Sequence, residues 1–150
     1  MDSEYDVKES SDFQKYYKHV RKKYKHSFDE DFATVIKVIT KKLVIEKGKY
    51  LNTPNTKPVH GLGSKVTHPV AFTRIQIKQA RDMCGRVVYL VDNDKKRIFL
   101  IDVYYKSDRD NPNTAIVSKA YYEYLAILEE ESKANATQES EVSETESKER

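Results

Sequence analysis

The chain contains 150 residues, of which 38% are apolar and 34% are charged. A chain of this length and composition is expected to fold as one small domain around a single core. It has no apolar run of the length that a membrane helix needs, and its N-terminus is acidic and polar where a signal peptide would be basic and then apolar, so we expect a cytoplasmic protein.

Charge is distributed unevenly along the chain. The net charge is +3, but residues 129–150 hold 8 acidic and 3 basic residues. Since the whole chain has 27 basic and 24 acidic residues, residues 1–128 carry 24 basic and 16 acidic ones, a net charge of +8. A basic folded part favours an anionic partner such as nucleic acid or an acidic protein, and a lysine-rich soluble surface is the alternative.

Cysteine and histidine are too few and too scattered to indicate a metal site. The single cysteine, Cys84, excludes an internal disulfide framework. His60 and His68 lie in a segment rich in proline and glycine, residues 48–70, which we expect to be a long surface loop. No carboxylate or cysteine accompanies them at ligand spacing, so we expect neither a metal nor a cofactor. Both histidines are then solvated or, alternatively, contact a phosphate or a base.

The N-terminal third predicts a short edge strand followed by two helices. Residues 5–9 alternate as a strand does. Apolar residues then recur twice at helical spacing, at Phe13, Tyr16, Tyr17, Val20 and Tyr24 and at Phe32, Val35, Ile36, Ile39 and Leu43. Ser27 and Glu30 form a capping-box pattern at the start of the second helix. Because the link is short, the two helices should form an antiparallel hairpin.

Residues 71–104 predict three consecutive antiparallel strands. The odd positions of residues 71–78 are apolar or small, so Arg74, Gln76 and Lys78 should share the opposite face. Residues 86–92 and 97–104 are apolar on both faces, as in strands that are covered on both sides, and a hairpin turn separates them. The helical hairpin should cover one face of this sheet.

The C-terminal part predicts one helix and a tail. Apolar residues at helical spacing place a helix at about residues 114–128, which can pack on the sheet or on a partner. Residues 129–150 have almost no apolar side chains and should form a disordered acidic tail. Electrostatic shielding of the basic face by this tail is an additional hypothesis.

This order of elements, with GRVVYLVDNDKKRIFLIDVYYKSDRDN at its centre, resembles the RelE/ParE superfamily of toxins, particularly its RelE-like and HigB-like members. In these proteins the middle strand begins with an arginine in a YRVVY-like motif, and the next strand ends in an aromatic-lysine run. Arg86 and Lys106 match these positions, and the resemblance covers roughly residues 5–128. Two features depart from the pattern: Gly85 stands where an aromatic often precedes the arginine, and the late tyrosine of the family has no unambiguous counterpart.

The resemblance implies an α+β, RelE-like fold, in which a small antiparallel sheet packs against an N-terminal helical hairpin and a C-terminal helix follows. It also implies the toxin of a type II toxin-antitoxin system. RelE-like members are metal-independent endoribonucleases, or mRNA interferases, that cut mRNA, usually on the ribosome, and are neutralised by a cognate antitoxin. Residues 1–128 would form this toxin domain, with mRNA and the antitoxin as its partners.

The resemblance, together with the chemistry of RNA cleavage, selects the site residues. Attack by a 2'-hydroxyl on the adjacent phosphorus needs a positioned backbone, charge stabilisation and proton transfer. Arginine can bind two phosphate oxygens at once, and a lysine among other cations has a lowered pKa that suits proton transfer, a role for Lys78 or Lys106. The catalytic candidates are Arg86, Lys78, Arg74 and Lys106. The substrate-binding candidates are Gln76, Arg81, Tyr104, Tyr105, Arg109, His60 and His68.

Two other functions are compatible with the sequence. A ParE-like toxin would target DNA gyrase without cutting RNA, although gyrase-directed members need no cluster such as Arg74, Lys78, Arg86 and Lys106. A basic RNA-binding or ribosome-binding module would bind RNA with a steep salt dependence and leave it intact.

Overall fold

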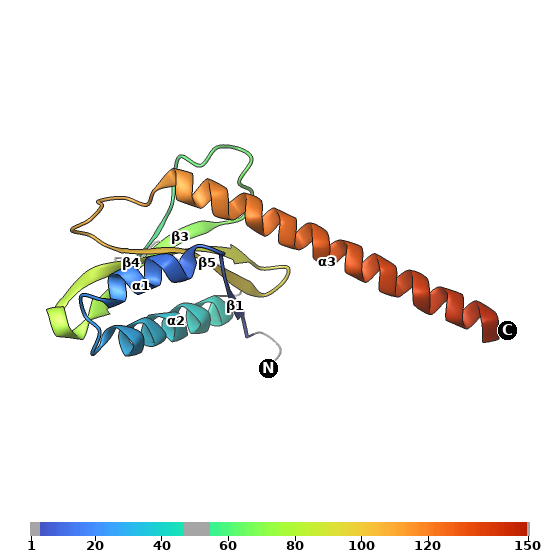
Figure 1. Cartoon of the computed structure of the whole chain (residues 1–150), viewed down its shortest axis with the longest axis horizontal. Coiled ribbons are helices and arrows are strands. Elements are labelled where there is room, and N and C mark those ends of the chain that lie inside the picture. The colour runs from blue at the N-terminus through green and yellow to red at the C-terminus, as the bar shows by residue number, and fades with distance from the viewer. Residues whose placement is uncertain (1–3, 47–54, 150) are drawn as a thin grey trace.

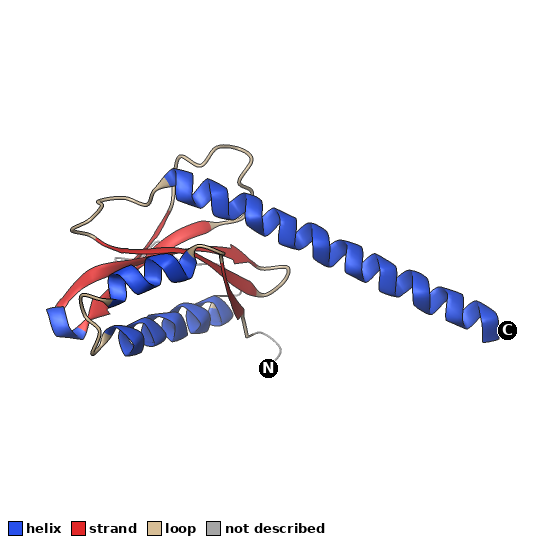
Figure 2. Ribbon diagram, viewed as in Figure 1, coloured by secondary structure: helices blue, strands red, loops and turns tan. Residues whose placement is uncertain are grey.

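The computed structural model of the chain describes residues 4–46 and 55–149, with side chains as far as residue 136. Its fold is α+β, as predicted (Figures 1 and 2). None of the described helices is both long and apolar enough to cross a membrane. The elements in chain order are β1 (Asp6–Glu9), α1 (Phe13–Arg21), α2 (Phe28–Ile45), β2 (Thr56–Pro58), β3 (Val70–Ile77), the 3-10 turn η1 (Lys78–Ala80), β4 (Asp82–Asp92), β5 (Arg97–Tyr105) and α3 (Thr114–Glu149).

The strands form one sheet in the order β1-β5-β4-β3-β2. The predicted meander of β3, β4 and β5 is antiparallel, and β2 joins it antiparallel within the segment that was expected to be a loop. β1 is an edge strand, as predicted, but it runs parallel to β5, so the expectation of an entirely antiparallel sheet was wrong. A parallel neighbour requires a long crossover connection, which the intervening helices and strands provide.

The helical hairpin covers one face of the sheet. Rings of the two helices pair in antiparallel order, with 5.9 Å between the ring centroids of Phe13 and Phe32 and 5.1 Å between those of Tyr17 and Phe28. Phe13 and Phe28 are fully buried against inward-facing residues of β3, β4 and β5. We call this side of the sheet the hairpin face.

The second helix begins where the sequence predicted, but the predicted capping box does not form. Ser27 is the N-cap residue and makes no side-chain capping hydrogen bond. The Glu30 carboxylate instead accepts a hydrogen bond of 2.9 Å from Nζ of Lys78. A tertiary ion pair has therefore replaced the local contact that sequence spacing favoured.

The first half of α3 covers the opposite face of the sheet, which we call the α3 face. Its buried residues pack against apolar side chains of β4 and β5; the α3 residues are Val117, Ala120, Tyr121 and Tyr124, and the strand residues are Val88, Leu90, Phe99 and Ile101. Both central strands are thus covered on both sides, which explains their continuous apolar sequence.

The structure extends α3 to Glu149, beyond residue 128 and through the segment for which the sequence predicted disorder. Figure 1 shows the second half of the helix projecting away from the sheet. Arg97 of β5 donates two hydrogen bonds, of 2.9 and 2.8 Å, to the Glu131 carboxylate. Lys133 also lies 3.6 Å from the Glu129 carboxylate one turn earlier. These contacts favour helix beyond the last apolar residue that packs on the sheet.

Candidate functional site

Arg74, Arg86 and Tyr104 are cross-strand neighbours. Arg86 of β4 is the register partner of Arg74 in β3 and of Tyr104 in β5. Adjacent strands lie about 4.8 Å apart, and directly paired residues point to the same side of a sheet. Arg109, which follows β5, places its guanidinium carbon 4.0 Å from the ring centroid of Tyr104. These four residues form a continuous group that we call the arginine row.

A β-bulge places Tyr104 in this row. Val88 pairs with Asp102 and Tyr89 pairs with Leu100, so Ile101 is the extra residue in β5. Strict alternation from Phe99 would bring Tyr105 to the α3 face and send Tyr104 to the hairpin face. Because the bulge adds one residue, Tyr104 comes to lie opposite Arg86 instead.

The two strand arginines repel each other, and neither forms an ion pair with a carboxylate of the described residues. Burial lowers the pKa of Arg86, and the neighbouring charge of Arg74 lowers it further, while Asp82 acts weakly in the opposite direction. The Arg86 guanidinium donates to the carbonyl oxygens of Met83 and Gly85 at 2.6 and 2.8 Å. In the described part of the chain, Nε of Arg74 is buried without a hydrogen-bond partner. A bound anion would relieve this repulsion.

Arg109 is held over Tyr104 by a buried carboxylate. Its Nη2 donates to Oδ2 of Asp102 at 2.7 Å, and Asp102 is only 1% exposed. Burial raises the pKa of Asp102, and the Arg109 charge opposes that shift. Burial also raises the pKa of Tyr104 to about 12, and the Tyr104 hydroxyl has no partner among the described residues. The sequence analysis missed Asp102, although a lone acid within the apolar run of β5 was a usable signal.

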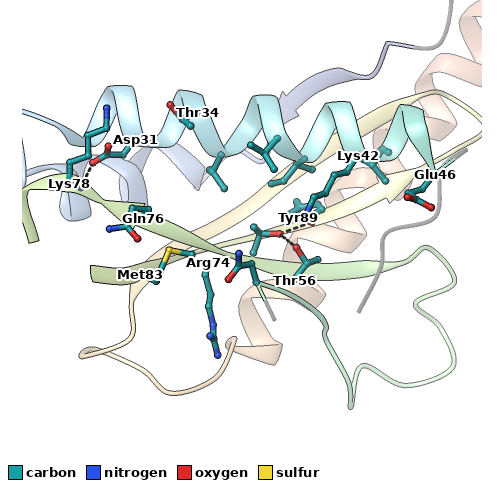
Figure 3. A pocket seen from close by; sticks show the side chains of 16 residues that line it. Asp31, Thr34, Lys42, Glu46, Thr56, Arg74, Gln76, Lys78, Met83 and Tyr89 are labelled. Atoms are coloured by element: carbon teal, nitrogen blue, oxygen red, sulfur yellow. Dashed lines mark hydrogen bonds between the residues drawn. The ribbon is translucent and has the colours of Figure 1, made fainter. Parts of the chain in front are cut away.

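Lys78 lies outside the row. Alternation along β3 predicted that it would share the face of Arg74, but the strand has a register shift and ends at Ile77. Lys78 begins η1 instead, and its backbone N–H donates to the Asp31 carboxylate at 3.0 Å. Figure 3 shows Lys78 beside α2 and the Arg74 side chain pointing away from that helix. The hydrogen bond that Nζ of Lys78 donates to the Glu30 carboxylate raises the pKa of Lys78, whereas the sequence analysis expected a lowered value.

Lys106 directly follows β5 and lies beside the start of β4. Its backbone N–H donates to the Cys84 carbonyl at 2.9 Å, and its Nζ is 2.9 Å from the Asp82 carboxylate. Both side chains of this pair are about half exposed. The pKa of Asp82 is lowered first by the hydrogen bond from Lys106 and also by the charge of Arg86. Asp82 therefore connects Lys106 electrostatically to the row.

The other predicted residues are divided between the two faces. Gln76 is exposed two positions beyond Arg74 in β3, and Arg81 is exposed at the end of η1 with a left-handed φ of 52°. Tyr105 is buried in the hairpin-face core and donates its hydroxyl hydrogen to the Val20 carbonyl, so it does not join the row. The structure thus separates two adjacent tyrosines that the sequence analysis treated alike.

The two loop histidines are not grouped with the row. His60 is exposed. The ring of His68 lies near Tyr121 and Tyr124 of α3, and its Nε2 is 3.7 Å from the Asp92 carboxylate at the far end of β4. In the described residues, His, Cys, Asp and Glu form no group of three that could hold a metal ion.

Two of the hollows along the sheet lie beside predicted site residues. One, of about 290 Å³, lies on the hairpin face between α2 and β3 and has a largely apolar wall (Figure 3). The hydroxyls of Thr56, Thr73 and Tyr89 form a hydrogen-bonded chain within it. The other, of about 340 Å³, is bordered by α1 and includes Tyr104 and Arg109 in its lining. Its α1 residues include Lys15 and His19, which the sequence analysis did not select although their spacing of four places them on one helix face.

Comparison of the chain with protein-family models, with curated proteins and with solved structures found no match.

Proposed function

We propose that this chain is a RelE/HigB-like toxin that cuts mRNA at the arginine row. The observation that carries the proposal is the pairing of Arg74 and Arg86 on adjacent strands, with the Arg109–Tyr104 stack beside them. Two neighbouring guanidinium groups suit a phosphodiester, because each can donate two hydrogen bonds to non-bridging oxygens. The order of the helices and strands is consistent with the RelE-like arrangement.

The row can supply charge stabilisation for a metal-independent reaction. Attack of a 2'-hydroxyl on the adjacent phosphorus builds negative charge on the equatorial oxygens, and Arg74 and Arg86 would neutralise that charge. Arg109 would bind a neighbouring phosphate, held in position by Asp102. Of the two lysine candidates, Lys106 is the better one for proton transfer, because the hydrogen bond to Glu30 keeps Lys78 protonated on the hairpin face.

The biological setting follows from the same proposal. The target would be mRNA, bound on the ribosome, and a cognate antitoxin would neutralise the toxin by covering its basic surface. No cofactor takes part in the proposed reaction. Residues 1–128 would form the toxin domain.

A second candidate is a basic module that binds RNA or ribosomes without cutting RNA. One observation favours it: both lysines with a proposed role in proton transfer are engaged in ion pairs, Lys78 with Glu30 and Lys106 with Asp82, each at 2.9 Å. The arginine row alone would suffice for phosphate binding with a strong salt dependence.

Induced expression followed by mapping of transcript 5' ends distinguishes these functions. We expect new 5' ends and growth arrest with the wild-type chain and the loss of both with Arg86→Ala. The matched control is Arg21→Ala, because Arg21 lies on α1 and pairs with Asp29, outside the row. Bound but intact RNA would indicate the non-catalytic module, and blocked DNA supercoiling with unchanged transcripts would indicate a gyrase-directed toxin. Full toxicity of a folded Arg86→Ala variant would refute the role of the row.

A further inference from the structure

A basic hollow continues the arginine row toward α1. It measures about 340 Å³ and lies where α1, β5 and the loop after β5 meet. Its lining residues are Lys15, Tyr16, His19, Val20, Val103, Tyr104, Asp108 and Arg109. Because Tyr104 and Arg109 belong both to the row and to this lining, the two features are contiguous.

The charge of the hollow suits a polyanion. Lys15 and His19 are exposed on α1, and Arg109 enters from the other side. The carboxylate of Asp102 is engaged with Nη2 of Arg109, while Nη1 of Arg109 is buried and has no hydrogen-bond partner within the described part of the chain. Arg109 is therefore anchored through one amino group and retains donor capacity on the other. Asp108 is the only acidic residue in the lining.

The hollow also offers an aromatic surface. Tyr16 is half-buried, and Nζ of Lys15 lies 5.3 Å from the centroid of its ring. A nucleobase can take the place of the ammonium group on this ring, which would release Lys15 to a phosphate. An aromatic ring among cations is the combination that proteins use to bind single-stranded nucleic acid.

We propose that this hollow is a second subsite for single-stranded RNA, next to the phosphate site at Arg74 and Arg86. Tyr16 would stack on one unpaired base, and Lys15, His19 and Arg109 would bind the phosphates beside it. The bound strand would cross the α3 face of the sheet from β3 over β4 to β5, a path of about 10 Å between Arg74 and Tyr104 at the usual strand spacing. It would then pass around the edge of β5 to α1, because β1 pairs with β5 only at residues 97–100. This inference rests on the proposed RNA-binding function and adds the path that the bound RNA takes over the protein surface.

Binding of labelled oligouridylates to the full chain tests the subsite. Oligonucleotides of about 4 and about 12 nucleotides both lie within the range of site sizes of single-strand binders, about 4–16 nucleotides. They carry 2'-O-methyl groups, which prevent attack by the 2'-hydroxyl, so that binding is measured by fluorescence anisotropy without cleavage. The variants are Lys15→Gln, His19→Gln and Tyr16→Leu, which retains an apolar side chain but removes the stacking surface. Lys18→Gln is the control, because Lys18 is exposed on α1 but does not line the hollow.

We expect the longer oligonucleotide to bind more tightly than the shorter one, and Tyr16→Leu to weaken only the longer one, by about 5-fold or more. Lys15→Gln should lower the slope of log affinity against log salt by about 0.7, the value for one lost phosphate contact with a single strand. Lys18→Gln should change neither property. Equal effects of Lys15→Gln and Lys18→Gln, or no dependence of affinity on length, would overturn the subsite. Tighter binding of polyglutamate than of RNA would also overturn it, in favour of an acidic protein.

The subsite and the proposed nuclease can fail separately. Transcript cleavage that depends on Arg86, together with equal oligonucleotide binding by the Lys15 and Lys18 variants, would leave the nuclease standing and remove the subsite. Binding that depends on length and on Tyr16, without any cleaved transcript, would support the subsite in a protein that binds RNA and does not cut it.

Discussion

At the scale of single residues, Tyr104 and Tyr105 show how one inserted residue decides which of two adjacent side chains joins the arginine row. Tyr105 points into the hairpin-face core, where it contacts the rings of Tyr24 and Phe28 and donates its hydroxyl hydrogen to Val20. Tyr104 lies on the other face, and its hydroxyl has no hydrogen-bond partner among the described residues. The difference follows from the bulge at Ile101, because a shift of one residue exchanges the two faces of a strand.

We therefore expect opposite results from two matched substitutions. Tyr105→Phe should lower the free energy of unfolding by about 0.5–1.5 kcal/mol, because it leaves the buried Val20 carbonyl without its donor. Tyr104→Phe should leave the stability unchanged or raise it slightly, because the hydroxyl it removes is buried without a protein partner. Urea denaturation of both variants measures the difference. A larger loss of stability for Tyr104→Phe would contradict this assignment of the two rings.

At the same scale, close packing explains why a glycine precedes Arg86. It is the register partner of Ile75, and a Cβ atom at this position would lie 2.9 Å from Cβ of Ile75. An aromatic residue before Arg86 would therefore collide with β3 on the hairpin face. The glycine is required by close packing between the strands, while the Arg86 side chain lies on the opposite face and donates to the Gly85 carbonyl.

At the scale of elements, the attachment of α3 depends on polar contacts as well as on its apolar residues. Arg97 lies between Glu131 and the Tyr124 ring, with its guanidinium carbon 5.9 Å from the ring centroid. The Tyr124 hydroxyl donates to the buried Asp92 carboxylate at 2.5 Å. These contacts connect the start of β5, the end of β4 and the middle of α3. They hold the helix to the sheet just before it extends into solvent.

Removal of the Glu131 charge should weaken this attachment in a way that depends on pH. The hydrogen bond from Arg97 lowers the pKa of Glu131 below 4.5. The folded state then binds fewer protons than the unfolded state, so the contribution of the pair to stability is complete above about pH 4.5 and is lost as the pH falls through the folded-state pKa. We expect Glu131→Gln to lower the free energy of unfolding by about 1–2 kcal/mol near neutral pH, with a difference that shrinks in acid.

Denaturation of the wild-type chain and the variant at a series of pH values measures this effect. Glu130→Gln is the matched control, because Glu130 is largely exposed and lies 3.9 Å from its only ion-pair partner among the described residues, Lys133. An exposed pair of this kind contributes little at any pH. A difference between the wild-type chain and Glu131→Gln that does not change with pH would show that the Arg97 pair is not its cause.

At the scale of the whole molecule, the path of α3 separates the acidic segment from the arginine row. Figure 1 shows the loop after β5 at one end of the molecule and the C-terminus at the opposite end. Electrostatic interactions in water are screened within about 8 Å at physiological ionic strength. Because α3 carries the acidic segment away from the sheet, the structure gives little support to the hypothesis that this tail shields the basic face.

Deletion of residues 133–150 tests this conclusion and retains Glu131. The deleted segment carries 5 acidic and 3 basic residues. We expect the affinity for the oligouridylates to stay within about twofold of the full chain at physiological salt, because α3 leads away from the sheet and electrostatic interactions are screened within about 8 Å. Affinity is measured at low and physiological salt. A marked increase at low salt that disappears with added salt would instead support shielding by the tail.

The sequence by itself determined the elements and their pairing where the pattern is local and continuous. The helical spacing of apolar residues predicted α1, α2 and the start of α3, and the apolar runs around the turn at residues 93–96 predicted β4 and β5. The proximity of Arg74 and Arg86 also followed from the sequence, because alternation within β3 and the pairing of consecutive strands place them on one face. Such features depend on periods of 3.6 and 2.0 residues, which neighbouring residues establish together.

Only the tertiary structure decided features that depend on one residue of register or on distant contacts. The bulge in β5 placed Tyr104, and not Tyr105, in the arginine row. The early end of β3 placed the Lys78 side chain next to Glu30, which is 48 residues away in the sequence. The parallel direction of β1 and the Asp102 contact that holds Arg109 likewise involve partners that alternation does not identify. Each of these outcomes is set by packing between separate elements, and a local pattern carries no information about that packing.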